Sequence, residues 1–89
     1  MSDVVLIWDL HDDPDGNVQH IAEHGLTRDE VASVFAAADA VTEESRSSDR
    51  PLTRGTTFTG RYVVVIWEHV DDDPLTIYSV TAYEADNDF

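Results

Sequence analysis

Cysteine and lysine are both missing from this chain of 89 residues. Without cysteine, the chain has neither a disulfide framework nor a thiolate metal site. Without lysine, the only basic side chains besides histidine are five arginines, which stand against 19 acidic residues and give a formal net charge of −14 at pH 7. Such an acidic surface repels a phosphate backbone and an anionic membrane, so binding to generic nucleic acid or to a membrane surface is disfavoured.

Long hydrophobic runs are also missing. The apolar run at residues 4–8 follows no basic segment and is too short for a signal peptide or a membrane span. We therefore expect a cytoplasmic protein, and the acidic, lysine-free composition also suits a cytoplasm of high salt. The length predicts a single domain over residues 1–89, with a frayed tail at residues 84–89.

Periodicity in the first half of the chain predicts one strand and two short helices. Residues 4–8 are β-branched, apolar and aromatic, which is typical of a buried strand. A short helix is expected over residues 17–24, closed by Gly25 in the left-handed conformation. Thr27 and Glu30 have the spacing of a capping box, which opens the second helix. The apolar stripe of this second helix consists of Val31, Val34, Phe35 and Ala38.

The second half of the chain predicts a loop followed by three strands. Residues 39–50 are polar and rich in serine, which favours a loop. Strands over 51–58 and 61–70 are joined by a two-residue link that contains Gly60, so they form a hairpin. The second of these strands is apolar on both faces, which places it centrally, and a last strand follows at 75–83. The order β-α-α-β-β-β predicts an α+β domain, in which two short helices pack on an antiparallel meander.

Several short motifs follow one another in a fixed order along the chain. In the first half they are the pair Trp8-Asp9 on the first strand, Asn17, the pair His24-Gly25, and Thr27 at the start of a helix. In the second half they are the pair Gly60-Arg61 before the longest strand and the pair Ala82-Tyr83 at the end of the last strand. In this order and spacing the chain resembles the BrnT-like proteins, which are toxin-like domains of the RelE superfamily in type II toxin–antitoxin systems. The resemblance covers roughly residues 5–84.

The resemblance implies a metal-independent endoribonuclease that needs no cofactor and is neutralised by an antitoxin protein. Cleavage of RNA by this route needs a proton-transfer group and cations that stabilise the charge on the phosphate. At the matching positions, His24 would transfer the proton, Arg54 and Arg61 would bind the phosphate, and Glu68 and Tyr83 would assist. The chain departs from the family pattern at two places. It lacks the basic residue that is usual near the first helix, and Tyr83 stands where the family has the arginine of a closing Ala-Arg pair. The phenol of Tyr83 offers a hydrogen bond but no positive charge.

Four of the five arginines lie within residues 46–61, where Asp49 is the only acid. This segment therefore carries a charge of +3, while the other residues, with one arginine and 18 acids, carry −17. A cationic segment on an acidic body can bind one phosphate or carboxylate at short range, with Arg46 and Arg50 as anion-binding candidates beside Arg54. The alternative is that these arginines pair with nearby carboxylates, which is the usual state of arginines on a surface.

Other functions stay open at this point. A dense acidic surface also suits a non-catalytic module that binds a basic protein partner, and a homodimer through an open sheet edge is compatible with either function. His20 and His24 are four residues apart on one helical face, but they would hold zinc only with a third ligand such as Asp15 or His69. A structural role is more common for such a pair, so we expect no metal.

Overall fold

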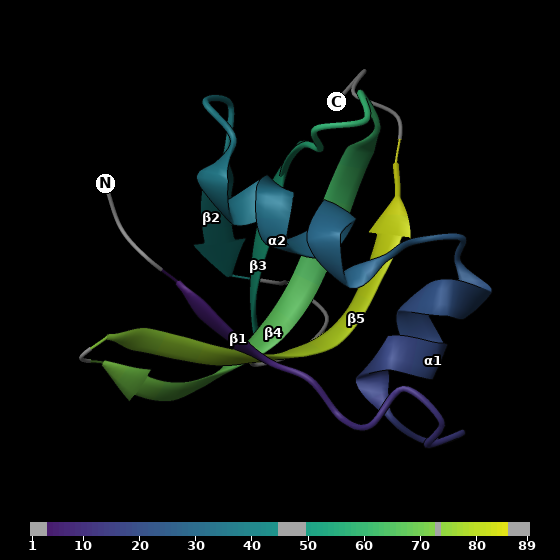
Figure 1. The fold of residues 1–89 in the computed structure, drawn as a ribbon. Coiled ribbons are helices and arrows are strands. Elements are labelled where there is room, and N and C mark those ends of the chain that lie inside the picture. Colours follow the sequence, from purple (N-terminus) through teal and green to yellow (C-terminus); the bar gives the residue numbers. More distant parts are fainter. Residues whose placement is uncertain (1–3, 45–49, 73, 86–89) are drawn as a thin grey trace.

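The computed structural model describes residues 4–44, 50–72 and 74–85, which form a five-stranded sheet and two helices (Figure 1). The α+β class and the two short helices expected from periodicity are confirmed. The elements in chain order are β1 (Val5–Ile7), α1 (Asn17–Glu23), α2 (Arg28–Ala36), β2 (Val41–Glu44), β3 (Pro51–Thr56), β4 (Tyr62–Asp72) and β5 (Leu75–Glu84). Neither described helix has the length and apolar character needed to cross a membrane.

The sheet has the strand order β1-β5-β4-β3-β2 and is mixed. Strands β2 to β5 are antiparallel neighbours, as expected for a meander, and β4 is central. β1 runs parallel to β5, with Leu6 opposite Ile77, a pairing that the sequence did not predict. The reason is topological, since the two helices separate β1 from the meander and the last strand returns beside it in the same direction.

Strand β2 replaces part of the loop expected over residues 39–50. A hydrogen bond of 2.7 Å joins the hydroxyls of Thr42 on β2 and Thr53 on β3. All four residues of β2 are exposed, so the strand is held by pairing with β3 and not by burial. An exposed polar strand has no hydrophobic alternation, which is why periodicity does not predict it. Residues 45–49 of the expected loop, Arg46 among them, lie outside the described residues.

Both helix boundaries follow the local signals in the sequence. Gly25 has a φ of +75°, the left-handed conformation expected just after a helix end. The hydroxyl of Thr27 accepts the Glu30 N–H at 3.2 Å, and the Glu30 carboxylate accepts the Thr27 N–H at 3.2 Å, so the predicted capping box is present. The hairpin before β4 is also confirmed, with Gly60 at a φ of +87°. The expected two-residue link is wrong, because β3 ends at Thr56 and β4 begins at Tyr62, so residues 57–61 connect the two strands.

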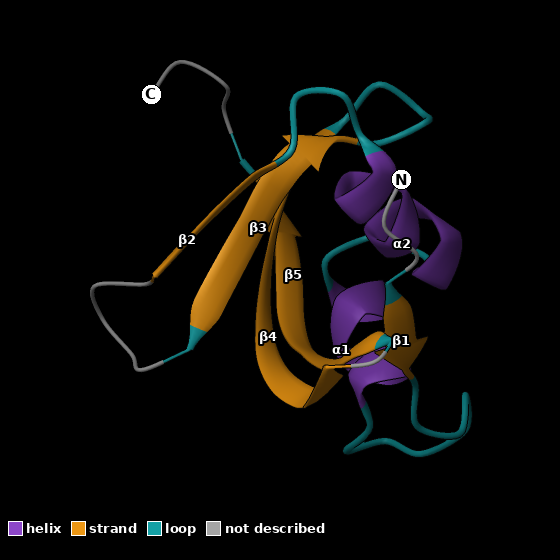
Figure 2. Cartoon of the chain, turned by 90° about the vertical axis from the view of Figure 1, so that its left-hand side faces the viewer, coloured by secondary structure: helices purple, strands orange, loops and turns teal. Residues whose placement is uncertain are grey.

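The hydrophobic core lies between the helices and one face of the sheet, as Figure 2 shows from the side. Of the stripe expected on α2, Val31 and Val34 are fully buried and Phe35 is half-buried. Ala38 is exposed because α2 ends at Ala36, before the stripe is complete. The strand side of the core consists of Val63, Val65, Trp67, Ile77 and Ala82.

Both ends of the chain differ in detail from the expected pattern. β1 is an edge strand and not a buried one, since Val5 and Ile7 are exposed and only Leu6 packs towards the core. Val5 and Ile7 alternate with Leu6 and so point to the other face of the sheet, where their side chains stay exposed. At the other end, Glu84 belongs to β5 and pairs with Val63 instead of starting a frayed tail. The last four residues of that expected tail lie outside the described residues.

The second face of the sheet is covered by neither helix, because both lie on the opposite side of the strands (Figure 2). Strand alternation and the registers bring side chains of β2 to β5 together on this face. We refer to it as the uncovered face, and its central residues are Val41, Glu43, Leu52, Arg54, Tyr62, Val64 and Tyr83.

Candidate functional site

A pocket of about 240 Å³ lies on the uncovered face and is lined by residues of four strands. Arg54 of β3 is paired with Val64 of β4, which is in turn paired with Tyr83 of β5. Because directly paired residues point to the same face, these three side chains lie in one row across the sheet. Leu52 of β3 and Glu43 of β2 complete the lining. The pocket therefore combines a mostly apolar floor with one cation, one carboxylate and one phenol.

Arg54 is the cation of this pocket, and neighbours on both sides hold its position. Its Nη1 donates a hydrogen bond of 2.9 Å to the Tyr62 hydroxyl, and its Nη2 lies 3.6 Å from Glu43 Oε2. The hydrogen bond to Tyr62 raises the pKa of Arg54, burial opposes this rise, and the charge of Glu43 adds to it. The guanidinium thus stays charged in a fixed position at the centre of the uncovered face.

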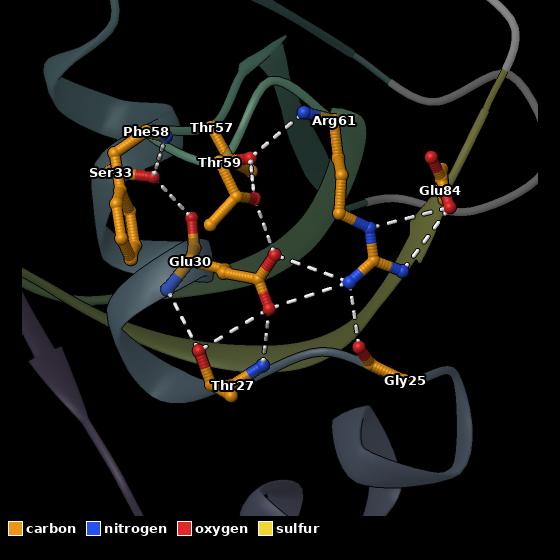
Figure 3. A network of polar contacts seen from close by, with 9 residues as sticks. All are labelled: Gly25, Thr27, Glu30, Ser33, Thr57, Phe58, Thr59, Arg61 and Glu84. Carbon is orange, nitrogen blue, oxygen red and sulfur yellow. Dashed lines mark hydrogen bonds and ion pairs between the residues drawn. The ribbon is translucent and has the colours of Figure 1, made fainter.

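Arg61 lies on the helix side of the sheet, in a polar network that joins α2, β4 and β5 (Figure 3). Its Nη1 donates to the Gly25 carbonyl at 2.7 Å and to Glu30 Oε2 at 3.2 Å, while its Nη2 donates to Glu84 Oε1 at 3.2 Å. Burial by itself raises the pKa of Glu30, but hydrogen bonds from Thr59, Arg61 and a backbone amide outweigh it and hold this pKa below its usual value. Arg61 therefore ties the helices to the sheet and does not reach the pocket.

His24 and Glu68 are predicted site residues that do not line the pocket of Arg54. His24 is exposed at the C-terminal end of α1, on the helix side. Glu68 forms an exposed ion pair with Arg50, with Nη2 and Oε1 2.7 Å apart. The rings of His20 and His24 meet edge to face at 5.8 Å, and the described part of the chain contains no group of three or more side chains able to hold a metal ion.

Of the five residues predicted to act in catalysis, only Arg54 and Tyr83 meet in one pocket. The expected joint binding of one phosphate by Arg54 and Arg61 is wrong, because the two side chains lie on opposite faces of the sheet. Two further residues of the site are Tyr62, which the sequence does not mark as a site residue, and Glu43, which it offers only as one of the carboxylates with which the arginines could pair. A signal for Tyr62 exists in principle, since it alternates with Val64 on β4, but Glu43 depends on a strand that periodicity does not reveal.

A second polar network joins β1, α1 and β5. The Asp9 carboxylate accepts hydrogen bonds from the Tyr78 hydroxyl at 2.5 Å and from the Asn17 N–H at 2.9 Å. The Asn17 side chain accepts the Asp9 N–H at 2.8 Å and donates to the Ile7 carbonyl at 2.9 Å. Asn17 is only 2% exposed, so each polar atom of its side chain is satisfied inside the fold. This network is structural and lies apart from the pocket.

The Tyr78 hydroxyl gives a direct test of the Asp9 network. Its hydrogen bond to Asp9, followed by burial, raises the pKa of Tyr78 from its ordinary value of 10.0 to about 12. Because the folded state holds this proton more tightly than the unfolded state, the resulting stabilisation is complete below pH 10.0 and is lost as the pH rises through about 12. In an ultraviolet absorbance titration we expect one late ionisation near pH 12. Tyr78→Phe should remove that step and Tyr83→Phe should retain it; a late step that survives Tyr78→Phe would refute the assignment.

Comparison with protein-family models, with curated proteins and with solved structures finds no match to this chain.

Proposed function

We propose that this chain is a protein-binding domain whose uncovered face receives a positively charged protein partner. The observation that carries the proposal is the pocket, in which Leu52 and Val64 form an apolar floor, Tyr83 forms a wall and Glu43 supplies a carboxylate. Protein interfaces combine a buried apolar or aromatic anchor with a charged rim, and tyrosine and arginine are enriched among the residues that dominate their binding energy. The pocket has both components within one small area.

The charge of the domain selects a basic partner over an RNA. The formal net charge is −14, and in the segment from which a cationic patch was expected, the arginines that the structure describes already have carboxylate partners. The pairs are Arg50 with Glu68, Arg54 with Glu43, and Arg61 with Glu30 and Glu84. An acidic surface attracts a basic protein and speeds its association, whereas it repels a phosphate backbone. The antitoxin implied by the family resemblance is one partner with which this proposal is compatible.

The test is isothermal titration of the domain with the protein encoded by the neighbouring gene, where an antitoxin would be encoded. Leu52→Asp places a charge in the apolar floor, and we expect it to weaken binding by about tenfold or more. The matched control is Leu10→Asp, the same change at a loop residue that is 75% exposed, and it should leave the affinity unchanged. Binding should also weaken as the salt concentration rises, because the attraction is between charges.

Equal affinities for the Leu52→Asp and Leu10→Asp variants would remove the uncovered face from the interaction. A neighbouring protein that does not bind at all would overturn the proposed function. Thermal melts of both variants check that each still folds, which is expected because Leu52 is only half-buried on the face away from the core.

A second candidate, metal-independent RNA cleavage, has one observation in its favour. Arg54 meets the phenols of Tyr62 and Tyr83 on the uncovered face, and a guanidinium with two hydroxyls offers hydrogen bonds to a phosphate. Against it, His24 lies on the helix side, so the pocket lacks the expected proton-transfer group. If the purified domain cleaves RNA and Arg54→Ala abolishes the cleavage, RNA cleavage is favoured over protein binding as the function. If the domain neither cleaves RNA nor arrests growth when expressed, this second candidate is wrong.

A further inference from the structure

Strand β2 forms one edge of the sheet, and no described segment pairs with its outer side. All four of its residues are exposed, including Val41 at 42%. An edge strand of this kind presents unpaired N–H and C=O groups to any extended chain that approaches it. The pairing with β3 and the hydroxyl contact between Thr42 and Thr53 hold this edge in place. The edge is thus already formed before a partner arrives.

The opposite edge of the sheet is less accessible. β1 has only three residues, and the Asn17 side chain donates a hydrogen bond of 2.9 Å to the Ile7 carbonyl at its end. Asn17 begins α1, so the start of this helix lies against the end of β1. A short edge that is capped by a side chain is one of the devices by which proteins prevent strand addition. Strand addition is therefore directed to β2.

The charge of β2 decides which chain it can accept. Glu43 points to the uncovered face and Glu44, as the next residue of the strand, points to the other. A second copy pairing through β2 would gather four carboxylates in one short ladder, and like charges across strands are destabilising. A homodimer through this edge is therefore disfavoured. A strand with basic side chains at two consecutive positions would meet one carboxylate on each face.

We infer that the positively charged partner binds by strand addition, pairing an extended segment with the outer edge of β2. Two consecutive lysine or arginine residues of that segment lie beside Glu43 and Glu44, and a β-branched or other apolar residue lies beside Val41. The inference rests on the proposed function, because it specifies how the same partner reaches the uncovered face. Main-chain hydrogen bonds supply affinity in this mode, and the alternating side chains supply specificity.

Glu43 connects this edge with the pocket. Its carboxylate lines the pocket and lies 3.6 Å from Arg54 Nη2, which is longer than a hydrogen bond. A cation on the added strand would therefore share the Glu43 carboxylate with Arg54, whose ion pair with Glu43 is a long one. Neighbouring parts of the partner then lie over the floor formed by Leu52 and Val64. One bound segment can contact the edge and the pocket together.

The experiment uses a blocked, fluorescently labelled peptide in which valines and threonines flank two consecutive arginines, and a second peptide with two glutamates in their place. The test variant is the double change Glu43→Arg with Glu44→Arg. The control is Asp12→Arg with Glu23→Arg, which makes the same change in net charge at exposed positions away from the sheet edge. Because all four residues of β2 are exposed, the test variant is expected to fold, and circular dichroism checks this.

The native chain and the control should bind the arginine peptide, and the test variant should bind it about tenfold more weakly while gaining affinity for the glutamate peptide. Hydrogen exchange measured by NMR should slow at those amides of Val41–Glu44 that face away from β3 when the arginine peptide is added. Equal losses in the two double variants, or protection confined to other strands, would overturn strand addition at β2.

The two proposals fail in different ways. If the neighbouring protein binds and Leu52→Asp weakens it, but Glu43→Arg with Glu44→Arg does not, then the proposed function stands and strand addition is wrong. If the arginine peptide protects the β2 amides but the neighbouring protein does not bind, then β2 can accept an added strand and the proposed function is wrong.

Discussion

Replacing Arg61 with alanine is expected to lower the free energy of unfolding by about 3 kcal/mol. The substitution removes the hydrogen bonds to the Gly25 carbonyl, Glu30 and Glu84. Glu30 then keeps its negative charge with a side chain that is only 8% exposed, and breaking a buried ion pair from one side leaves an uncompensated charge. The cost is large because the lost partner is the main cation facing this buried carboxylate. Urea denaturation of the native and variant proteins measures it directly.

The matched control for this prediction is Arg28→Ala. Arg28 is exposed at the first position of α2, where a positive charge faces the positive end of the helix dipole. Its removal should change the free energy of unfolding by no more than about 0.5 kcal/mol. If Arg61→Ala were as mild as Arg28→Ala, the network would not carry the fold, and the structural role assigned to Arg61 would be wrong.

Changing Asn17 to aspartate is expected to cost about 3 kcal/mol, although the two side chains have nearly the same shape. The amide nitrogen that donates to the Ile7 carbonyl would become a carboxylate oxygen that faces it. The new charge would be buried at a position that is 2% exposed and would lie next to the Asp9 carboxylate. Both effects act in the same direction, because the lost donor and the added charge each destabilise the folded state.

Gln19→Glu is the control for the aspartate substitution. It makes the same amide-to-acid change on the same helix, at an exposed position whose side chain donates only to the His11 carbonyl. We expect a loss of about 0.5 kcal/mol or less, since exposed polar contacts contribute little. Similar losses for the two variants would mean that the charge of α1 as a whole, and not the contact with Ile7 and Asp9, determines the effect.

Together these two networks explain the order of short motifs in the sequence. Asp9 and Asn17 bind each other across β1 and α1, and Gly25 takes the left-handed conformation while its carbonyl accepts a hydrogen bond from Arg61. Gly60 allows the turn that places Arg61 directly before β4. In this chain these motif residues therefore hold the helices on the sheet. Of the motif residues, Tyr83 lines the pocket, and the other lining residues, Glu43, Leu52, Arg54 and Val64, lie outside the motifs. The motifs by themselves therefore do not define the site.

The elements that the sequence predicted correctly are those set by neighbours along the chain. The capping box of Thr27 and Glu30, the left-handed Gly25 and the hairpin at Gly60 each depend on contacts within a few residues. The two short helices and the three late strands follow from the same local signals and from hydrophobic periodicity. The sequence also predicts, as one alternative, that the arginines pair with carboxylates, because acidic side chains greatly outnumber the arginines.

Tertiary structure decided what depends on distant segments. The parallel position of β1 and the existence of β2 come from pairing with β5 and β3, which no local pattern encodes. The same long-range arrangement put Arg54 on the uncovered face and Arg61 on the helix side, although the two are only seven positions apart in the sequence. Composition by itself determined that the chain is acidic and that its cations are few. The tertiary structure decided which cations line the pocket, because the pocket lies on the face of the sheet that the helices leave uncovered.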